Sequence, residues 1–302
     1  MQTKTGYVTI IGKPNVGKST LMNALLGEKI SIATSKPQTT RKRVLGILSD
    51  ENHQIIFLDT PGILSPKYLL QEKMMDHVTK SVHDADVLVC MIDIKDDPHG
   101  VKTLEDETVA KLLEKSSAKK ILIINKIDKV KPDEVKELAL AIKEKQIFAD
   151  ILGVSAITHF NVDLVKDIIQ SHLPEHPKYY PDDQITDETE RFFVSEIVRE
   201  KILEQYRDEV PYSTEVVIEE FKERKKGKDY ILVSIIIEKE SQKPILIGKK
   251  GEAIKNLGEL ARNAIDRFLG RPVYLELRVK VKGQWRSDKH MLRQFGYDIE
   301  NE

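Results

Sequence analysis

The sequence predicts two domains, a doubly wound α/β domain with a mostly parallel sheet followed by a smaller α+β module. Three observations lead to this prediction. The chain has 302 residues, too many for most single-core domains. Its first half alternates short apolar runs with amphipathic segments. A stretch with three prolines and many acids then precedes a half with a different element order. We therefore expect domains at residues 1–173 and 190–302, joined by a linker at 174–189.

Each half has its own predicted element order. Apolar runs rich in β-branched residues are typical of strands buried on both faces, and helical spacing fills the gaps between them. In the first half we expect strands over 7–12, 54–60, 87–93, 120–126 and 151–156, and helices over 18–27, 105–116, 132–145 and 162–173. In the second half we expect a helix over 188–207, strands over 213–224 and 229–240, helices within 244–269 and a strand over 273–283.

Composition narrows the class of protein. Apolar residues make up 40% of the chain and charged residues 32%, which is ordinary for a soluble protein. No apolar stretch approaches the roughly 20 residues that span a bilayer. The N-terminus lacks the apolar core of a secretion signal, so we expect a cytoplasmic protein. The single cysteine, Cys90, excludes an internal disulfide.

The segment GKPNVGKS, residues 12–19, fits the phosphate-loop pattern G-x-x-x-x-G-K-[ST] between a predicted strand and a predicted helix. Glycines let such a loop curl so that its N–H groups face phosphate oxygens, and the helix N-terminus adds positive character. Lys18 is expected to bridge the β- and γ-phosphates, and the Ser19 hydroxyl to coordinate Mg²⁺. The residues expected to bind phosphate here are Gly12, Asn15, Val16, Gly17, Lys18, Ser19 and Thr20.

A second motif distinguishes GTP from ATP. NKID, residues 125–128, follows a predicted buried strand. The Asp128 carboxylate can accept two hydrogen bonds from guanine, an arrangement that adenine does not offer. Asn125 is expected to tie this loop to the phosphate loop, and the Lys126 stem to lie along the base. Ser155 and Ala156 are expected to complete the guanine site, with the Ala156 N–H facing the guanine oxygen.

Two further loops are candidates to sense the γ-phosphate. In DTPG, residues 59–62, Asp59 is expected to hold Mg²⁺ through a water and Gly62 to donate its N–H to the γ-phosphate. In PQTTRKR, residues 37–43, either Thr39 or Thr40 could coordinate the magnesium, and we favour Thr40. Loops held by a γ-phosphate and released on hydrolysis form a switch.

These motifs, matched in order, resemble the translation-factor-like GTPases, which implies a P-loop NTPase domain of the Ras-like kind. Ras-like enzymes place a water-orienting glutamine where this chain has Ile63, so we expect slow intrinsic hydrolysis. GTPases that resemble this group and carry asparagine at the position of Asn15 can bind K⁺ beside the phosphates. The resemblance thus implies a K⁺-stimulated GTPase with Lys18, Thr40, Gly62 and Asn15 as its catalytic residues.

The second half contains the segment ILIGKKGEAI, residues 245–254, at the entrance to a predicted helix. It resembles the GXXG loop of KH domains, which clamps about four nucleotides of a single strand, and the α-β-β-α-α-β order resembles a type II KH domain. Cations follow in RVKVKGQWRSDKH, with Trp285 among them, whereas KERKKGK at 222–228 fits a solvated hairpin turn at least as well as an RNA contact. The expected RNA-binding residues are Ile245, Ile247, Gly248, Lys249, Lys250, Gly251, Ile254, Arg278, Lys280, Lys282, Arg286 and Lys289.

A GTPase domain followed by a KH module in about 300 residues resembles a family of bacterial ribosome-assembly GTPases. The resemblance implies binding to the 3′ end of 16S rRNA, association with the 30S ribosomal subunit, and loose peripheral contact with the inner face of the cell membrane. We expect a monomer. Two alternatives stay open: a GTPase whose C-terminal module binds protein, and a metabolic P-loop kinase, against which the NKID motif argues.

Overall fold

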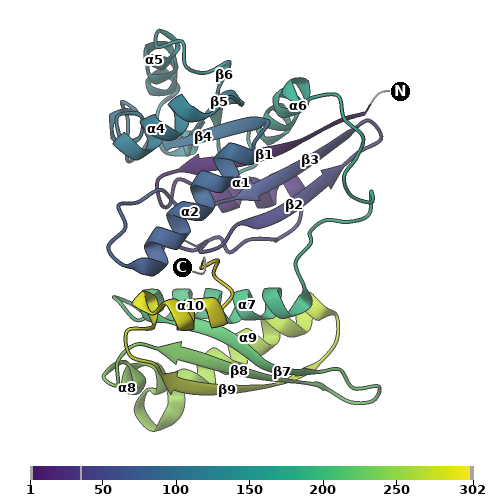
Figure 1. The fold of residues 1–302 in the computed structure, drawn as a ribbon, viewed down its shortest axis with the longest axis vertical. Helices are drawn as coiled ribbons and strands as arrows, with labels where there is room; N and C mark the ends of the chain where they lie inside the picture. Colours follow the sequence, from purple (N-terminus) through teal and green to yellow (C-terminus); the bar gives the residue numbers. More distant parts are fainter. Residues whose placement is uncertain (1–2, 35, 300–302) are drawn as a thin grey trace. The chain divides into compact units, whose positions relative to one another are not determined.

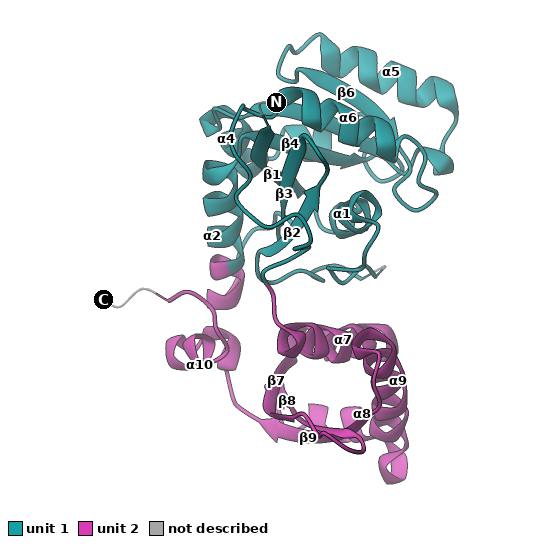
Figure 2. Ribbon diagram, turned by 90° about the vertical axis from the view of Figure 1, so that its right-hand side faces the viewer, with its two compact units in different colours: residues 1–66, 74–187 teal, residues 67–73, 188–302 magenta. Residues whose placement is uncertain are grey.

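The computed structural model describes residues 3–34 and 36–299. Contacts between residues divide the chain into two compact units (Figure 2). The first comprises Met1–Pro66 and Met74–Asp187, and the second comprises Lys67–Lys73 and Glu188–Glu302. The predicted fold class, a mostly parallel α/β domain followed by a smaller α+β module, is confirmed.

The first unit is built on a six-stranded sheet with the order β2-β3-β1-β4-β5-β6 (Figure 1). All neighbouring pairs are parallel except β2 and β3. The antiparallel edge strand was not predicted, whereas the five predicted strands are present. The strands are β1 (Lys4–Gly12), β2 (Val44–Ser49), β3 (His53–Asp59), β4 (Val87–Asp93), β5 (Lys119–Asn125) and β6 (Asp150–Val154).

Helices cover both faces of this sheet, which explains why its central strands are apolar on both sides. Side chains of α2, α3, α4 and α5 pack on one face in a single apolar cluster, and α1 and α6 lie together in the other layer. The sequence did not predict α2 or α3. The helices are α1 (Lys18–Leu26), α2 (Leu69–Asp84), α3 (Val101–Leu104), α4 (Glu107–Lys115), α5 (Pro132–Lys143) and α6 (Val162–His172).

Much of the segment that the sequence predicts as a linker is ordered against the first unit. The Gln54 side chain accepts hydrogen bonds from the backbone of Tyr179 and Tyr180, at 2.8 and 3.0 Å. The Ile47 N–H, on edge strand β2, donates to the Ile185 carbonyl at 2.8 Å. Edge strands with unpaired backbone groups favour aggregation, so this segment covers part of an exposed edge.

The second unit packs helices against one face of a three-stranded sheet with the order β7-β8-β9. Strands β7 and β8 are antiparallel, and β8 and β9 are parallel. The elements are α7 (Glu190–Gln205), β7 (Glu215–Lys222), β8 (Asp229–Ile237), α8 (Gln242–Ile247), α9 (Glu252–Leu269), β9 (Val273–Val281) and α10 (Lys289–Gln294). In neither unit does the described part of the chain contain a helix both long and apolar enough to cross a membrane.

Candidate functional site

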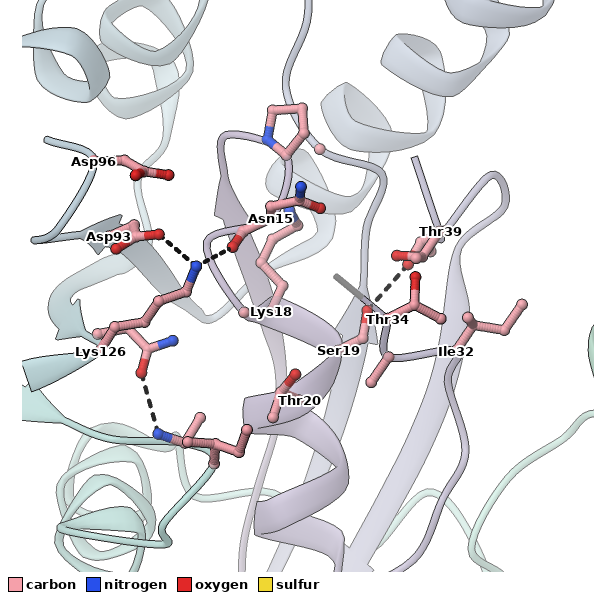
Figure 3. A pocket seen from close by; sticks show the side chains of 18 of the residues that line it. Asn15, Lys18, Ser19, Thr20, Ile32, Thr34, Thr39, Asp93, Asp96 and Lys126 are labelled. Carbon is pink, nitrogen blue, oxygen red and sulfur yellow. Dashed lines mark hydrogen bonds and ion pairs between the residues drawn. The ribbon is translucent and has the colours of Figure 1, made fainter. Parts of the chain in front are cut away.

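The phosphate loop connects the end of β1 to the start of α1 and borders a cavity of about 550 Å³ (Figure 3). The loop requires glycine at Gly17 for two reasons. Its φ of 103° lies in the left-handed region, which side chains disfavour. A Cβ there would also collide with the side-chain amide of Asn125. The loop therefore packs directly against the NKID segment, as a shared nucleotide site requires.

The Lys18 side chain is buried beneath this loop. Its ammonium donates to the carbonyls of Gly12 and Lys13, both at 3.2 Å. Burial lowers the pKa of Lys18 to about 8, and the nearby Asp59 carboxylate opposes that shift. A lysine desolvated in this way gains stability when a polyphosphate arrives, because the phosphate charge replaces lost hydration.

Three oxygen-bearing side chains converge at the start of α1. The Ser19 hydroxyl donates to Asp59 Oδ2 at 2.7 Å, and the Thr40 hydroxyl donates to the same oxygen at 3.1 Å. Asp59 Oδ1 is buried without a hydrogen-bond partner among the described residues. Burial raises the pKa of Asp59, and the Ser19 hydrogen bond opposes that rise. Two hydroxyls and an orphaned carboxylate oxygen are a donor set suited to Mg²⁺.

On the opposite side of the cavity, Lys126 is held in place by the phosphate loop and by an acid that sequence reasoning missed. Its ammonium donates to the Asn15 carbonyl at 2.8 Å and forms an ion pair with Asp93. Asp93 is the last residue of β4 and pairs in register with Asn125. Its place at the carboxyl end of a parallel strand, where ligands bind in such sheets, is the signal that could have identified it.

Asn125 joins three segments of the site. Its amide donates to the Val16 carbonyl at 2.7 Å, and its oxygen accepts the Ala156 N–H at 3.1 Å. The Ser155 hydroxyl donates to Asp128 Oδ1 at 2.7 Å. That hydrogen bond is the largest cause of the lowered pKa of Asp128, which therefore remains a carboxylate able to accept hydrogen bonds from guanine.

The cavity brings together many of the residues that the sequence predicts to bind nucleotide. Those lining it are Asn15, Gly17, Lys18, Ser19, Thr20, Thr40, Gly62, Asn125, Lys126 and Ala156. Five predicted residues do not line it. Gly12, Val16 and Asp59 each accept a hydrogen bond from a residue that does, whereas Asp128 and Ser155 bond to each other. Thr39, the alternative to Thr40 as a magnesium ligand, also lines the cavity. Residues that line the cavity without having been predicted are Pro14, Ile32, Ala33, Thr34, Gln38, Asp93, Lys95, Asp96, Lys129 and Ile157.

The side chain of Ile63 points away from the cavity. It is 1% exposed and belongs to the apolar cluster under α2–α5. Its backbone N–H donates to the Gly12 carbonyl at 3.0 Å. A side chain held in this core cannot contact a water beside the phosphates.

In the second unit, the GXXG segment forms a tight turn between α8 and α9. Gly248 has φ of 75°, and a Cβ there would overlap the Ala253 side chain. Lys249 and Lys250 are exposed, and their ammonium groups have no ion pair or hydrogen bond to another described residue. Ile245 on α8 is 52% exposed. The turn thus presents two free cations beside an apolar side chain.

A groove of about 570 Å³ lies between α9 and β9. Apolar side chains form much of its surface, while cations and one carboxylate also line it. Its lining residues are Lys228, Ile254, Lys255, Gly258, Glu259, Arg262, Val273, Tyr274, Leu275 and Leu277. Ile254 is thus the one predicted RNA-binding residue within this groove.

The predicted cations of the last strand do not line the groove. Side chains alternate between faces along a strand. Leu275, Leu277, Val279 and Val281 of β9 pack on the helix side, so Arg278 and Lys280 face the other side of the sheet. There Arg278 pairs with Glu276 at 2.7 Å, and Lys280 pairs with Glu219.

The segment after β9 folds back onto its own unit. Trp285 is fully buried, and its indole N–H donates to the Ser213 carbonyl at 2.9 Å. Arg286 is paired with Glu238, to which its Nε donates at 3.1 Å. Lys282 is exposed after the end of β9, and Lys289 is exposed at the start of α10. None of these residues lines the groove.

Comparisons with known proteins assign both units to families. Residues 7–126 match the family described as "50S ribosome-binding GTPase", and residues 209–286 match the KH domain family. The chain is 43% identical to GTPase Era of Syntrophus aciditrophicus over 297 residues, which cover 98% of this chain and 95% of that protein. It is also 43% identical to GTPase Era of Clostridium botulinum, with 97% and 98% covered.

Two solved structures match nearly the whole length of this chain. A crystal structure of Era in complex with MgGDPNP and nucleotides 1506–1542 of 16S ribosomal RNA matches with a TM-score of 0.90 and 42% identity, covering 98% of this chain and 100% of that one. An Aquifex aeolicus Era variant bound to GDP·AlF₄⁻ matches with a TM-score of 0.90 and 41% identity, with the same coverage. This chain is therefore a member of the Era family of GTPases, enzymes that hydrolyse GTP.

Proposed function

We propose that this GTPase is a switch that binds the 3′ end of 16S rRNA and acts in the assembly of the 30S ribosomal subunit. The observation that carries the proposal is the GXXG turn, which presents the free ammonium groups of Lys249 and Lys250 at the N-terminus of α9. Cations at a helix N-terminus suit a phosphate backbone, and an adjoining apolar groove suits bases. Nucleotides of 16S rRNA are bound in the Era structure that this chain resembles.

Residues of the first unit would bind the nucleotide. Lys18 would hold the β- and γ-phosphates, and Asp128 would select guanine. Ser19, Thr40 and Asp59 would hold Mg²⁺, with Asp59 acting through a water. When bound, the ion neutralises charge on the phosphates. Because Thr40 and Gly62 lie on separate loops at this cavity, loss of the γ-phosphate would release both loops.

Hydrolysis is proposed to be slow without further positive charge, because Ile63 cannot orient water. We assign K⁺ binding to Asn15, whose side chain lies at the cavity beside Lys18 (Figure 3). An ion held there would add charge next to the phosphates. GTP turnover should then fall when Na⁺ replaces K⁺, and the difference should disappear in Asn15→Ala. Equal turnover in both salts would exclude this role.

The proposal extends to RNA contacts outside the groove and to cellular location. Arg278, Lys280, Lys282, Arg286 and Lys289 would contact phosphates outside the groove, since none of them lines it. A monomer acting in the cytoplasm, with peripheral contact at the inner face of the cell membrane, is the setting that the family implies.

The test of the proposed function is the double variant Lys249→Glu/Lys250→Glu. Its affinity for a single-stranded RNA with the 16S rRNA 3′-terminal sequence should fall more than about tenfold. The slope of log K against log salt should shrink by about 1.4, because each phosphate contact to a single strand contributes about 0.7. Lys143→Glu/Lys145→Glu, at exposed positions of the first unit, makes the same charge change as a control. Equal RNA binding by both variants would refute the RNA role of the GXXG turn.

A further inference from the structure

A row of side chains crosses the sheet of the second unit and ends at its free edge. Lys222 on β7 pairs in register with Tyr230 on β8, and Tyr230 pairs in register with Tyr274 on β9. The two tyrosine rings stack, with centroids 5.9 Å apart and an interplanar angle of 16°. Lys222 Nζ and the Arg224 guanidinium each lie 5.9 Å from the Tyr230 centroid.

Tyr274 is left uncovered at the outer end of this row. It is 57% exposed, and β9 is the edge strand of the sheet. One face of its ring is covered by Tyr230, while no strand of the described residues lies beside the other. The Tyr230 hydroxyl donates to Glu276 at 2.8 Å, which fixes the ring that supports Tyr274. The geometry is that of a rigid aromatic surface with one open face.

Tyr274 lies at the rim of the groove between α9 and β9, on the edge strand. Its ring stacks on Tyr230 on the sheet face away from α9, whereas Leu277 and Ile254 line the groove from the helix side. Lys228 and Lys255 also line it and have no ion pair or hydrogen bond to another described residue. Lys228 belongs to the KERKKGK segment, which the sequence left open between a solvated turn and an RNA contact.

Two acids near the stacked tyrosines are paired with cations. Glu276 is paired with Arg278 at 2.7 Å, and Glu220 is paired with Lys222 at 2.8 Å. Glu259 lines the groove alongside Arg262. The free positive charge around the ring therefore favours a polyanion with flat, uncharged groups.

We propose that Tyr274 is a stacking platform for a nucleobase of single-stranded RNA at the mouth of the groove. The inference rests on the proposed RNA-binding function and adds a base contact outside the GXXG turn. Stacking on an aromatic ring is tolerant of sequence, because every base offers a flat face. Tyr274 should thus contribute affinity for single strands without selecting which base is bound.

The test compares Tyr274→Ala with Tyr274→Phe in the full-length protein. The probe is a single-stranded RNA of twelve nucleotides with the 16S rRNA 3′-terminal sequence. Loss of the ring should weaken binding about tenfold, whereas phenylalanine should stay within about twofold of wild type. Leu260→Ala is the matched control, because Leu260 is an exposed apolar residue of α9 outside the groove. Wild-type affinity in Tyr274→Ala, or equal losses in the alanine and phenylalanine variants, would overturn the platform.

A direct readout comes from Tyr274→Trp. The wild-type chain has one tryptophan, the buried Trp285, so its emission provides the reference. Stacked bases should quench the added fluorescence at saturating RNA, and unchanged emission would overturn the proposal. The outcomes also separate the two claims. RNA binding that depends on Lys249 and Lys250 but not on Tyr274 removes the platform alone, whereas absence of binding by the wild type removes both.

Discussion

Replacing Asp93 with asparagine should weaken binding of guanine nucleotides by disturbing Lys126. The Asp93 carboxylate is buried at 4% exposure and forms an ion pair with the Lys126 ammonium. Asparagine keeps the shape and the Oδ1 that accepts the Lys95 N–H at 3.1 Å. It replaces Oδ2, which accepts from the Lys126 ammonium, with an NH₂ group, so Lys126 loses both the charge and the acceptor that orient it.

The size of the effect follows from the cost of ordering one long side chain. The ion pair with Asp93 and the hydrogen bond to the Asn15 carbonyl hold the Lys126 ammonium in place at the cavity. In the variant, binding must order that side chain, which costs about 0.5–1.5 kcal/mol. We therefore expect Kd for GDP to rise by roughly two- to twelvefold, with the change mostly in the dissociation rate.

Stopped-flow release of a fluorescent GDP analogue measures this effect directly. Asp96→Asn is the control, because Asp96 lines the same cavity but forms no ion pair with Lys126. Preference for guanine over adenine should be unchanged, since Asp128 supplies it. Unaltered release in Asp93→Asn would refute the reasoning, as would an equal effect of Asp96→Asn, which would indicate a general loss of charge.

Three further predictions test other parts of the structure. Gly17→Ala should lower the affinity for GDP, measured by titration, at least about tenfold. The new Cβ collides with Asn125, and the left-handed φ adds about 1–2 kcal/mol. Gly27→Ala, with φ of 71° and open space around it, is the control and should leave the affinity for GDP unchanged. Lys18, with its pKa lowered to about 8 by burial, should take up a fraction of a proton when GDP binds at pH 8, because the phosphates favour its charged form. Calorimetry in two buffers can measure this uptake, and proton release would contradict it. Trp285→Ala should lower the free energy of unfolding by about 3–5 kcal/mol in urea titrations followed by circular dichroism, and a loss below about 1 kcal/mol would show that the indole is not a core residue.

Much of the fold can be predicted from local sequence patterns. There are physical reasons why the sequence did not predict strand β2 and helix α2. The central strands are apolar because helices cover both of their faces. The sequence did not predict strand β2, because its short apolar run, VLGILS, contains Gly46 and the strand pairs only with β3, at the edge of the sheet. Helix α2 has mean hydropathy near neutral and carries charges along its length, so its apolar stripe is weak.

Some residues of the candidate sites could likewise be predicted from local sequence, whereas others depend on how the chain folds. Motifs of fixed spacing placed the phosphate loop and the NKID segment, because consecutive residues act together there. Asp93 could not be paired with Lys126 without the register of β4 and β5. On β9, the alternation in LRVKVK places Arg278 and Lys280 on one face, but the sequence does not say which face adjoins α9. Likewise, burial of Trp285 depends on a return of the chain after β9.

The central claim is that GTP controls RNA binding by this chain, and one titration tests it most directly. Single-stranded RNA carrying the 16S rRNA 3′-terminal sequence, and a scrambled RNA of equal length, would be titrated against protein loaded with GDP or GDPNP. We predict tight binding of the terminal sequence in the GDPNP state, and weaker binding of that sequence in the GDP state and of the scrambled RNA in both. Equal affinity for both RNAs in both nucleotide states would contradict the account.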